Sequence, residues 1–333
     1  MITYAIVAAC FVFCAVYNGM PGGSSLIKGL FVPICAYVIM AVSLNLTVGI
    51  LGELSLGHAG FMCLGAFVGS TFSILTQESL TSVWIRFPLA ILIGGLVAGA
   101  AGVLIGIPVL RLRGDYLAIV TLAFGEIIRN VINCLYISLD GSALHIAFNN
   151  PNVPGKLLVN GPAGATGVTK IATFGMGFAL TLFTLFVVLN LIDSRSGRAI
   201  MAIRDNRIAA EAMGLNVTKY KMMAFVTSAV LAGMAGALYG LNFSTVAASK
   251  FKFDTSILVL VFVVLGGIGN IRGSIISATL LTILPELLRA FANYRMLIYA
   301  IVLILVMLAT NNDTFKSFLR RLKPGQKKKK EVV

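Results

Sequence analysis

Long apolar runs follow one another along almost the whole chain, separated by short stretches of glycine, proline and charged residues. A helix that crosses a bilayer needs about 20 mostly apolar residues, and most of these runs approach that length. The pattern therefore predicts an all-α fold, that of a polytopic membrane protein with about ten transmembrane helices. The runs expected to span the membrane are 1–17, 26–48, 59–76, 87–110, 116–138, 171–192, 222–243, 254–268, 274–291 and 295–310.

The eighth run, 254–268, is the shortest and ends in a glycine-rich turn, Leu265–Asn270 (LGGIGN). Non-helical backbone survives at membrane depth only where protein or a water-filled cavity satisfies its polar groups. We therefore expect this segment to line a pore, with Gly266 and Gly267 at a translocation path or its gate.

The composition excludes an ordinary soluble domain. Of the 333 residues, 58% are hydrophobic and only 11% are charged, whereas about a quarter of the residues of a soluble domain are charged. The five cysteines lie in apolar runs, the two histidines are far apart, and no G-x-x-x-x-G-K-[ST] phosphate loop is present. We therefore expect no metal, no cofactor and no catalytic residue, and no ATP site of that type.

The net charge of +14 is concentrated at one end of the chain. Eight of the 26 Lys and Arg residues fall in the last eighteen residues, opposed only by Glu331. Positive charge beside spans favours the cytoplasmic side, so the excess predicts orientation and contact with lipid headgroups, with no need for nucleic acid. Ten spans then place both termini in the cytoplasm. The expected organisation is a transmembrane permease domain at 1–314, an external loop at 139–170, a cytoplasmic loop at 193–221 and a basic tail at 315–333.

Small residues recur at helical spacing inside two of the runs. Interfaces between membrane helices are enriched in such residues because these let the backbones approach closely. We therefore expect tight helix packing at these glycines. They are Gly95, Gly99, Gly102 and Gly106 in the fourth run, and Gly236 and Gly240 in the seventh.

Charged residues inside the fifth run need partners. Glu126 and Arg129 lie three residues apart, on one face of a helix, and a lone charge near the bilayer centre costs about 3 kcal/mol on insertion scales. We expect the two to pair, either for structure alone or within a translocation path or its gate. Asp115, which follows two arginines at the start of this run, is either part of an interfacial charge cluster or part of that path.

The connection 193–221 holds six basic and three acidic residues. Ala209 and Ala210 favour a short helix with little side-chain bulk, which Gly214 can end with a left-handed cap. Such a helix suits a knob that seats in a cleft of another protein, although the composition fits an interfacial helix about as well.

Four segments, taken in order, resemble the LivM-type permeases of branched-chain amino acid transporters. In the third, Ala209, Ala210 and Gly214 also resemble the coupling-loop motif of ABC importer permeases, with Ile208 where the general pattern has glutamate. In the first, Glu53 stands where the family pattern has glutamine. The resemblance covers roughly residues 30–310. The segments are Gly52–Phe61 (GELSLGHAGF), Arg113–Arg129 (RGDYLAIVTLAFGEIIR), Ser196–Asn216 continued through Tyr220, Ala224–Phe225 and Gly233–Tyr239, and Leu265–Asn270.

The resemblance implies a permease subunit of the bacterial or archaeal cytoplasmic (inner) membrane. It also implies that the chain works in the lipid bilayer with three kinds of partner. They are a second homologous permease, two cytoplasmic ATPase subunits and an external solute-binding protein. ATP would then be hydrolysed by the partners, so the chain itself is not expected to be an enzyme. The expected coupling residues are Arg204, Asp205, Ala209, Ala210, Glu211 and Gly214. The candidate residues of the translocation path or gate are Glu53, Asp115, Thr121, Glu126, Arg129, Gly266 and Gly267.

The substrate and the energy source have alternatives. The resemblance implies leucine, isoleucine and valine, but it also admits other amino acids or urea. An ion-coupled secondary transporter acting alone would use a proton or sodium gradient and would be expected to contain inverted repeats around broken helices. A membrane scaffold or polytopic enzyme is disfavoured, because the runs contain few titratable groups.

The charge distribution leads to a testable prediction. Deleting Lys327–Lys330 should leave uptake largely intact, because only the loop 193–221 is expected to act in coupling. The deletion should weaken the preference for one membrane topology or the contact with lipid headgroups. Uptake is measured in cells whose membranes are also assayed for correct insertion of the truncated chain. Complete loss of uptake by a correctly inserted truncation would contradict this division.

Overall fold

The protein is represented by a computed structural model, which describes residues 7, 14, 25–112, 114–140, 143–149, 154–289, 294 and 297–304. The chain divides into two units, Met1–Leu280 and Leu281–Val333. Apart from residues 7 and 14, the expected span 1–17 lies outside the described residues, and so does the basic tail 315–333.

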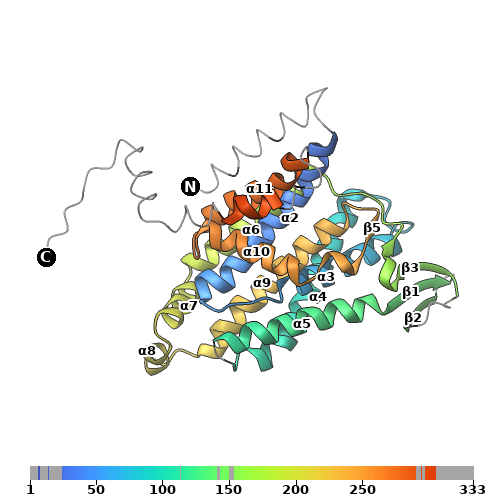
Figure 1. Ribbon diagram of the computed structural model, residues 1–333. Helices are drawn as coiled ribbons and strands as arrows, with labels where there is room; N and C mark the ends of the chain where they lie inside the picture. The colour runs from blue at the N-terminus through green and yellow to red at the C-terminus, as the bar shows by residue number, and fades with distance from the viewer. Residues whose placement is uncertain are drawn as a thin grey trace. The chain divides into compact units, whose positions relative to one another are not determined.

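Six helices of the described residues are long and apolar enough to cross a membrane, and they confirm six of the expected runs. Their apolar length, with few charges, is what suits them to a bilayer. Two shorter helices, α7 (Arg195–Asp205) and α8 (Arg207–Ala212), connect α6 to α9 (Figure 1). The six are α2 (Ser25–Asn45, continued by a π-helix at Leu46–Leu51), α3 (His58–Leu75), α4 (Val83–Val109), α5 (Asp115–Asn133), α6 (Phe174–Asp193) and α9 (Val217–Gly240).

The eighth and ninth expected runs form shorter helices. Helix α10 (Phe253–Gly266) has 14 residues and α11 (Ile271–Leu287) has 17. At 1.5 Å per residue these helices are about 21 and 26 Å long, less than the roughly 30 Å of a hydrocarbon core. Of the run 295–310, the structure describes residues 297–304, which are helical. Within the described residues, six helices thus have the length and the apolar composition of the expected spans.

A small sheet corrects the expectation of an all-α fold. Five antiparallel strands run in the order β2-β1-β3-β4-β5, and two short 3-10 helices, Gly161–Ala163 and Ala248–Lys250, flank β4 and β5. The sheet and α8 lie at opposite ends of the helices of the first unit (Figure 1). The strands are β1 (Leu135–Asp140), β2 (Ala143–Phe148), β3 (Lys156–Asn160), β4 (Gly164–Thr166) and β5 (Thr245–Val246).

The sheet also shortens the fifth expected run. That run was expected to stay helical to residue 138, but α5 ends at Asn133 and β1 begins at Leu135. Apolar composition does not distinguish a helix from a strand, and the partners of this strand come from elsewhere in the chain. Thus β1 pairs with β2 and β3, and the buried Ser138 donates a hydrogen bond of 2.7 Å to the carbonyl of Pro154.

Helices of the first unit pack closely at positions occupied by glycine. Helix α9 packs chiefly against α3 and α4, and a Cβ added at Gly236 would collide with the carbonyl oxygen of Met62. A Cβ at Gly102 would lie 2.7 Å from the Cβ of Ala229. Backbones approach this closely only where side chains are very small, so the expected tight packing at the six glycines is confirmed.

Helix α2 does not end at Asn45 but changes its winding. Residues Leu46–Leu51 form a buried π-helix, which ends at Gly52 with φ +79°. Asn45 holds this junction to the turn between α10 and α11. Its Nδ2 donates to Ser274 Oγ at 2.8 Å, and its Oδ1 accepts from the backbone N–H of Gly269 at 2.9 Å. The side chain thereby replaces backbone hydrogen bonds that the interrupted helices lack.

The helix packing gives a prediction for stability. Gly236→Val should lower the free energy of unfolding of the detergent-solubilised chain by about 1–3 kcal/mol or more, because overpacking pushes α9 away from α3. The matched control is Gly175→Val in α6, where an added Cβ meets nothing within 4 Å. Both are compared by thermal denaturation, and equal losses in the two variants would show that the contact at Gly236 does not matter.

Candidate functional site

The short helix expected in the loop 193–221 is present and its ends are locally encoded. Helix α7 (Arg195–Asp205) and helix α8 (Arg207–Ala212) meet at Asn206, whose Oδ1 accepts from the N–H of Ala209 at 3.0 Å. Such side-chain caps are typical of helix N-termini. Gly214 follows α8 with φ +81°, a conformation that favours glycine. The expected left-handed cap is therefore confirmed.

Two apolar side chains project from α8 and the turn after it. Ile208 is 80% exposed and Met213 is 84% exposed, while Ala210 is buried against Ile203 and Val217. The sequence interpretation did not place Ile208 or Met213 among the contact residues. The available signal was that Ile208 and Met213 are large apolar side chains in a short segment made mainly of alanine and charged residues. We refer to Ile208 and Met213 as the knob.

The other residues expected in coupling fall into exposed and inward-facing groups. Ala209 is exposed, and Glu211 accepts from Arg207 at 2.9 Å across one turn of α8. Asp205 is exposed and pairs with Arg204 at 2.9 Å. Arg204 also faces inward, because its Nη1 donates to the carbonyl oxygen of Gly49 at 2.9 Å.

Glu53 lies beyond the π-helix and pairs with Lys221 of α9. The Lys221 side chain is only 8% exposed and that of Glu53 16%, so removal of either partner would leave a charge poorly solvated. The pair joins the end of the π-helix to the re-entry of the loop 193–221 into the helices. The sequence motifs did not reveal this partner for Glu53.

Thr121 fixes the contact between α5 and the segment that precedes α3. Its hydroxyl donates to the carbonyl of Ala118 at 2.9 Å, and its Oγ1 accepts from the backbone N–H of Leu56 at 3.1 Å. A Cβ added at Gly57 would collide with the carbonyl oxygen of Thr121. Thr121 is therefore a buried packing position of α5.

The expected pairing of Glu126 with Arg129 is confirmed. Arg129 donates to Glu126 Oε2 at 2.7 Å from both Nε and Nη2, and both side chains are half-buried. Glu126 Oε1 also accepts from the N–H of Phe253 at 3.1 Å, at the start of α10. A small pocket beside the pair is lined by residues of α3, α5 and α10 together with Lys252. The geometry fits both a structural pair and a pair beside a path.

The remaining candidate path residues lie elsewhere. Gly266 ends α10 in backbone contact with Gly273, and Gly267 has φ +91°. Asp115 is the first residue of α5, and its side chain lies outside the described part of the chain. Thr121, Glu126 and Arg129 all lie on α5, where Glu126 bonds to Arg129. Glu53 lies instead beside the π-helix and pairs with Lys221 of α9.

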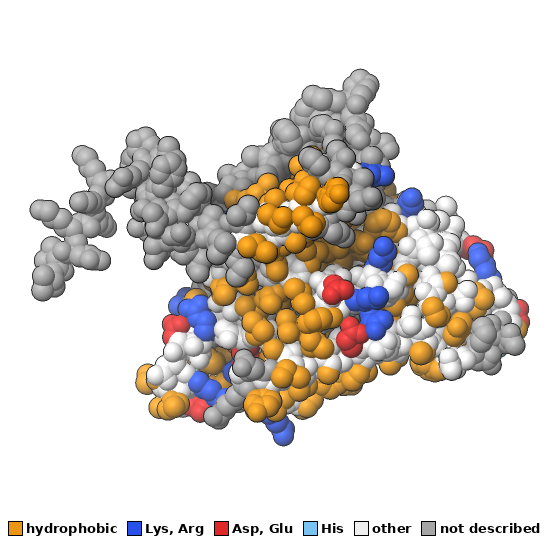
Figure 2. All heavy atoms as spheres, viewed as in Figure 1, with side chains coloured by type: hydrophobic (Ala, Val, Ile, Leu, Met, Phe, Trp, Pro, Cys, Tyr) orange, Lys and Arg blue, Asp and Glu red, His pale blue; other side chains and the backbone are white. Residues whose placement is uncertain are grey.

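One face of α5 is exposed along its whole length. Only 22% of that span is buried, against 89% of the span in α2. Figure 2 shows apolar side chains over much of the described surface on its side of the molecule, with charged groups gathered near α7 and α8, near the strands and in between. The exposed residues of this stripe are Tyr116, Ile119, Ala123, Ile127 and Val131.

A buried polar cluster joins α2, α3 and α9. His58 Nε2 lies 2.9 Å from Ser228 Oγ and 3.3 Å from Ser43 Oγ. Ser228 donates to the carbonyl of Ser43, and Ser43 donates to that of Met40. Because each hydroxyl has one hydrogen, Nε2 must be the donor to both. His58 therefore acts as a structural link between α2, α3 and α9. In the described residues no group of three or more His, Cys, Asp or Glu is placed to hold a metal.

Comparison with known proteins gives a consistent result. The model of the family described as "Branched-chain amino acid transport system / permease component" matches residues 26–307. A relative from Salmonella typhimurium, the high-affinity branched-chain amino acid transport system permease protein LivM, is 36% identical over 306 residues. This match covers 82% of the chain and 66% of that relative, so the chain spans slightly less than two thirds of the LivM relative's length.

Two further relatives match at least as large a share of the chain, at lower identity. The high-affinity branched-chain amino acid transport system permease protein LivH of Salmonella typhimurium is 26% identical, over 88% of the chain and 91% of the relative. The ribose import permease protein RbsC of Haemophilus influenzae is 25% identical, over 82% of the chain and 81% of the relative. No solved structure matches the chain.

The pair in α5 gives a prediction for stability. Glu126→Gln should destabilise the solubilised chain by about 1–3 kcal/mol, because Arg129 loses its ionic partner while partly buried. The double variant Glu126→Gln/Arg129→Met should regain part of this loss. As a control, Glu211→Gln breaks the exposed pair with Arg207 and should cost no more than about 0.5 kcal/mol. Thermal denaturation distinguishes these, and a double variant less stable than Glu126→Gln would contradict the pairing argument.

Proposed function

Because the chain belongs to the family of branched-chain amino acid transport system permease components, we propose that it is a membrane permease subunit of an ABC importer. It would form, with a homologous permease, the pathway for leucine, isoleucine and valine. Separate ATPase subunits would drive the transport. The observation that carries this proposal is an exposed apolar knob on α8 of a chain that resembles LivM over most of its length.

Two relatives support a paired permease. In Salmonella typhimurium, LivM and LivH are both named as permease proteins of a high-affinity branched-chain amino acid transport system. Both resemble this chain, and LivH does so over nearly its whole length. A second permease of the same family is therefore the partner that we propose. Its place would be the exposed face of α5, which leaves a polar pair, Glu126 and Arg129, beside an otherwise apolar stripe.

The position of α5 suits a path between the two permeases. A polar pair that faced lipid would be unfavourable, whereas a wet path or a partner can solvate it. We propose that Glu126 and Arg129 lie along this path together with Asp115 at the start of the same helix. Thr121, which is buried against the segment before α3, would support the wall of the path from within the chain. Gly266 and Gly267, which interrupt α10, would form part of its gate.

The opposite ends of the helices suggest the orientation. Helix α8 and the sheet lie at opposite ends of the first unit, so if α8 meets the ATPases, the sheet faces an external solute-binding protein. We propose ten spans in the bacterial or archaeal cytoplasmic membrane, with both termini and the tail 315–333 in the cytoplasm. The transmembrane domain would be 1–314, with the external loop at 139–170 and the cytoplasmic loop at 193–221.

The knob gives the coupling a physical basis. An apolar side chain that is four-fifths exposed on a cytoplasmic loop gains free energy when a protein cleft covers it. Docking of Ile208 and Met213 on an ATPase subunit would link nucleotide-driven closure of the ATPases to rearrangement of the permease helices. Ala209, Glu211 and Gly214 would shape the contact, since they keep the helix narrow, charged on one side and short.

The substrate remains a separate proposal. The ribose permease RbsC resembles the chain over a similar length, so the family's members are not named for one substrate alone. Branched-chain amino acids are favoured by the higher identity to LivM, while other amino acids or urea are the alternative. An ion-coupled transporter is the other alternative, and it would transport without ATPases.

Reconstitution tests the function. In proteoliposomes that hold the chain with its homologous permease, the ATPases and the binding protein, leucine uptake should require ATP. Met213→Arg and Ile208→Arg should reduce ATPase co-purification and uptake about tenfold, because a charge replaces the apolar contact.

The control and the opposing outcomes are specific. Ile146→Arg changes an equally apolar, 58% exposed side chain in β2 and should leave ATPase co-purification unchanged. Uptake of urea in place of leucine would contradict branched-chain amino acids as the substrate and support urea instead. Uptake driven by an ion gradient without ATP would refute the ABC assignment, and unchanged ATPase binding in both knob variants would refute the docking.

A further inference from the structure

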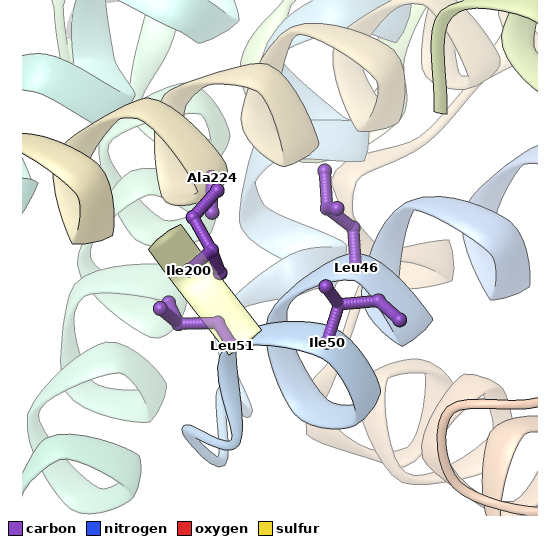
Figure 3. Close-up of a cluster of buried hydrophobic side chains, with 5 residues drawn as sticks. All are labelled: Leu46, Ile50, Leu51, Ile200 and Ala224. Carbon is purple, nitrogen blue, oxygen red and sulfur yellow. The ribbon is translucent and has the colours of Figure 1, made fainter. Parts of the chain in front are cut away.

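The π-helix Leu46–Leu51 is packed directly against the two helices that flank α8. A buried apolar cluster joins three of its side chains to Ile200 of α7 and Ala224 of α9, as Figure 3 shows. The five side chains come from three separate segments of the chain. The cluster consists of Leu46, Ile50, Leu51, Ile200 and Ala224.

A guanidinium group reinforces this contact on the α7 side. Arg204 donates at 2.9 Å to the carbonyl oxygen of Gly49, one of the last carbonyls of the π-helix. The last carbonyls of a helix lack partners within it and favour a nearby positive charge. The stem of Arg204 lies against Gly52, where an added Cβ would approach its Cγ to 2.5 Å. Arg204 therefore fits the end of the π-helix by charge and by shape.

A second ionic tie lies on the α9 side. Lys221 binds Glu53, one residue beyond the glycine that ends the π-helix. The Glu53 N–H donates to the carbonyl of Thr47 at 3.1 Å, which keeps Glu53 against the π-helix. Arg204 precedes α8 and Lys221 follows it. Both arms of the loop that carries the knob are thus attached to the same short segment, 46–53.

The opposite side of the π-helix contacts the turn between α10 and α11. A Cβ added at Gly49 would collide with Asn45 Oδ1 and with the backbone nitrogen of Gly269. That nitrogen donates to Asn45 Oδ1 at 2.9 Å, and Asn45 Nδ2 donates to Ser274 at 2.8 Å. At Gly49 the π-helix is therefore packed directly against the turn.

From these contacts we propose that the π-helix transmits movement of the knob to the glycine turn at 267–270. The proposal rests on the proposed function. Arg204, Glu53 and Lys221 act as positioning residues in this path, since they touch neither ATP nor substrate. The apolar cluster keeps the three segments together, and the two ionic ties make the π-helix follow both arms of the loop. Glu53 thereby belongs to coupling, although its motif first suggested the translocation path.

The test measures how many leucine molecules are imported per ATP hydrolysed in the reconstituted complex. Arg204→Met removes the bond to Gly49 together with the exposed pair with Asp205, and Lys221→Met removes the bond to Glu53. Each variant should lower this ratio about tenfold. The ATPases should remain bound and active, because the knob is unchanged. The charge-swapped variant Glu53→Lys/Lys221→Glu should recover part of the ratio that Lys221→Met loses.

The matched control lies on the same helix as Arg204. The Nη1 of Arg198 in α7 donates to the carbonyl of Asp193, within the loop itself, so Arg198→Met removes a similar charge and should leave the ratio unchanged. Correct insertion and co-purification of all subunits are checked for every variant. If a methionine variant fails these checks, Lys221→Arg and Lys221→Gln are compared in its place. Lys221→Arg should retain most of the import ratio, and Lys221→Gln should not.

A spectroscopic readout tests transmission directly. Ile268 in the turn is 60% exposed, so Ile268→Cys, in a chain whose five native cysteines are replaced, can carry an environment-sensitive fluorophore. Binding of ATP should change its emission, and Arg204→Met should abolish the change while Arg198→Met preserves it.

The outcomes separate the two proposals. A wild-type complex that imports no leucine with ATP refutes the proposed function. If wild type imports leucine but Arg204→Met and Lys221→Met keep its ratio and its fluorescence change, transmission through the π-helix is refuted. A parallel loss of ATP hydrolysis and uptake at constant ratio also refutes it, because that result places the two residues in assembly.

Discussion

The structure depends on one constraint, that backbone polar groups inside a membrane need partners supplied by the protein. Regular α-helices satisfy this constraint along most of the chain, but two neighbouring segments interrupt the α-helical hydrogen bonding. Helix α2 becomes a π-helix at Leu46, and α10 stops at Gly266 before the chain turns into α11. Asn45, the residue before the π-helix, joins the two segments, because its amide accepts from the N–H of Gly269 and donates to Ser274. One buried side chain thus allows two irregular segments to meet.

The same break explains the distribution of charge nearby. Arg204 donates a hydrogen bond to the carbonyl of Gly49, near the end of the π-helix. Lys221 forms an ion pair with Glu53, just beyond it. Each tie joins the interior to the loop that carries α8. By contrast, α9 packs against α3 and α4 through glycines at which an added Cβ would collide with the neighbouring helix. The molecule therefore combines a tightly packed group of helices with an irregular segment held by polar contacts.

The α5 region shows how local patterns and long-range contacts share the site. The spacing of Glu126 and Arg129 is enough to predict their pairing, because residues three apart meet on a helix surface. The bond from Glu126 to the N–H of Phe253 is not predictable in that way, since 127 positions separate the two residues. In the same way, apolar composition carried the expected helix through residue 138, and only pairing with distant strands shows that Leu135–Asp140 is a strand.

The sequence by itself determined six spans, the short helix α8 with its Gly214 cap, the glycine packing faces and the pair in α5. These follow from hydrophobic length, helical spacing and glycine conformation, which act over a few residues. The tertiary structure alone decided the sheet, the contact of Arg204 with Gly49, the partner of Glu53 and the junction at Asn45. Each of these joins residues far apart in the chain, and their hydrogen bonds exist only after the helices have packed. The residues of the loop were recognisable in advance, but their attachment to the π-helix was not.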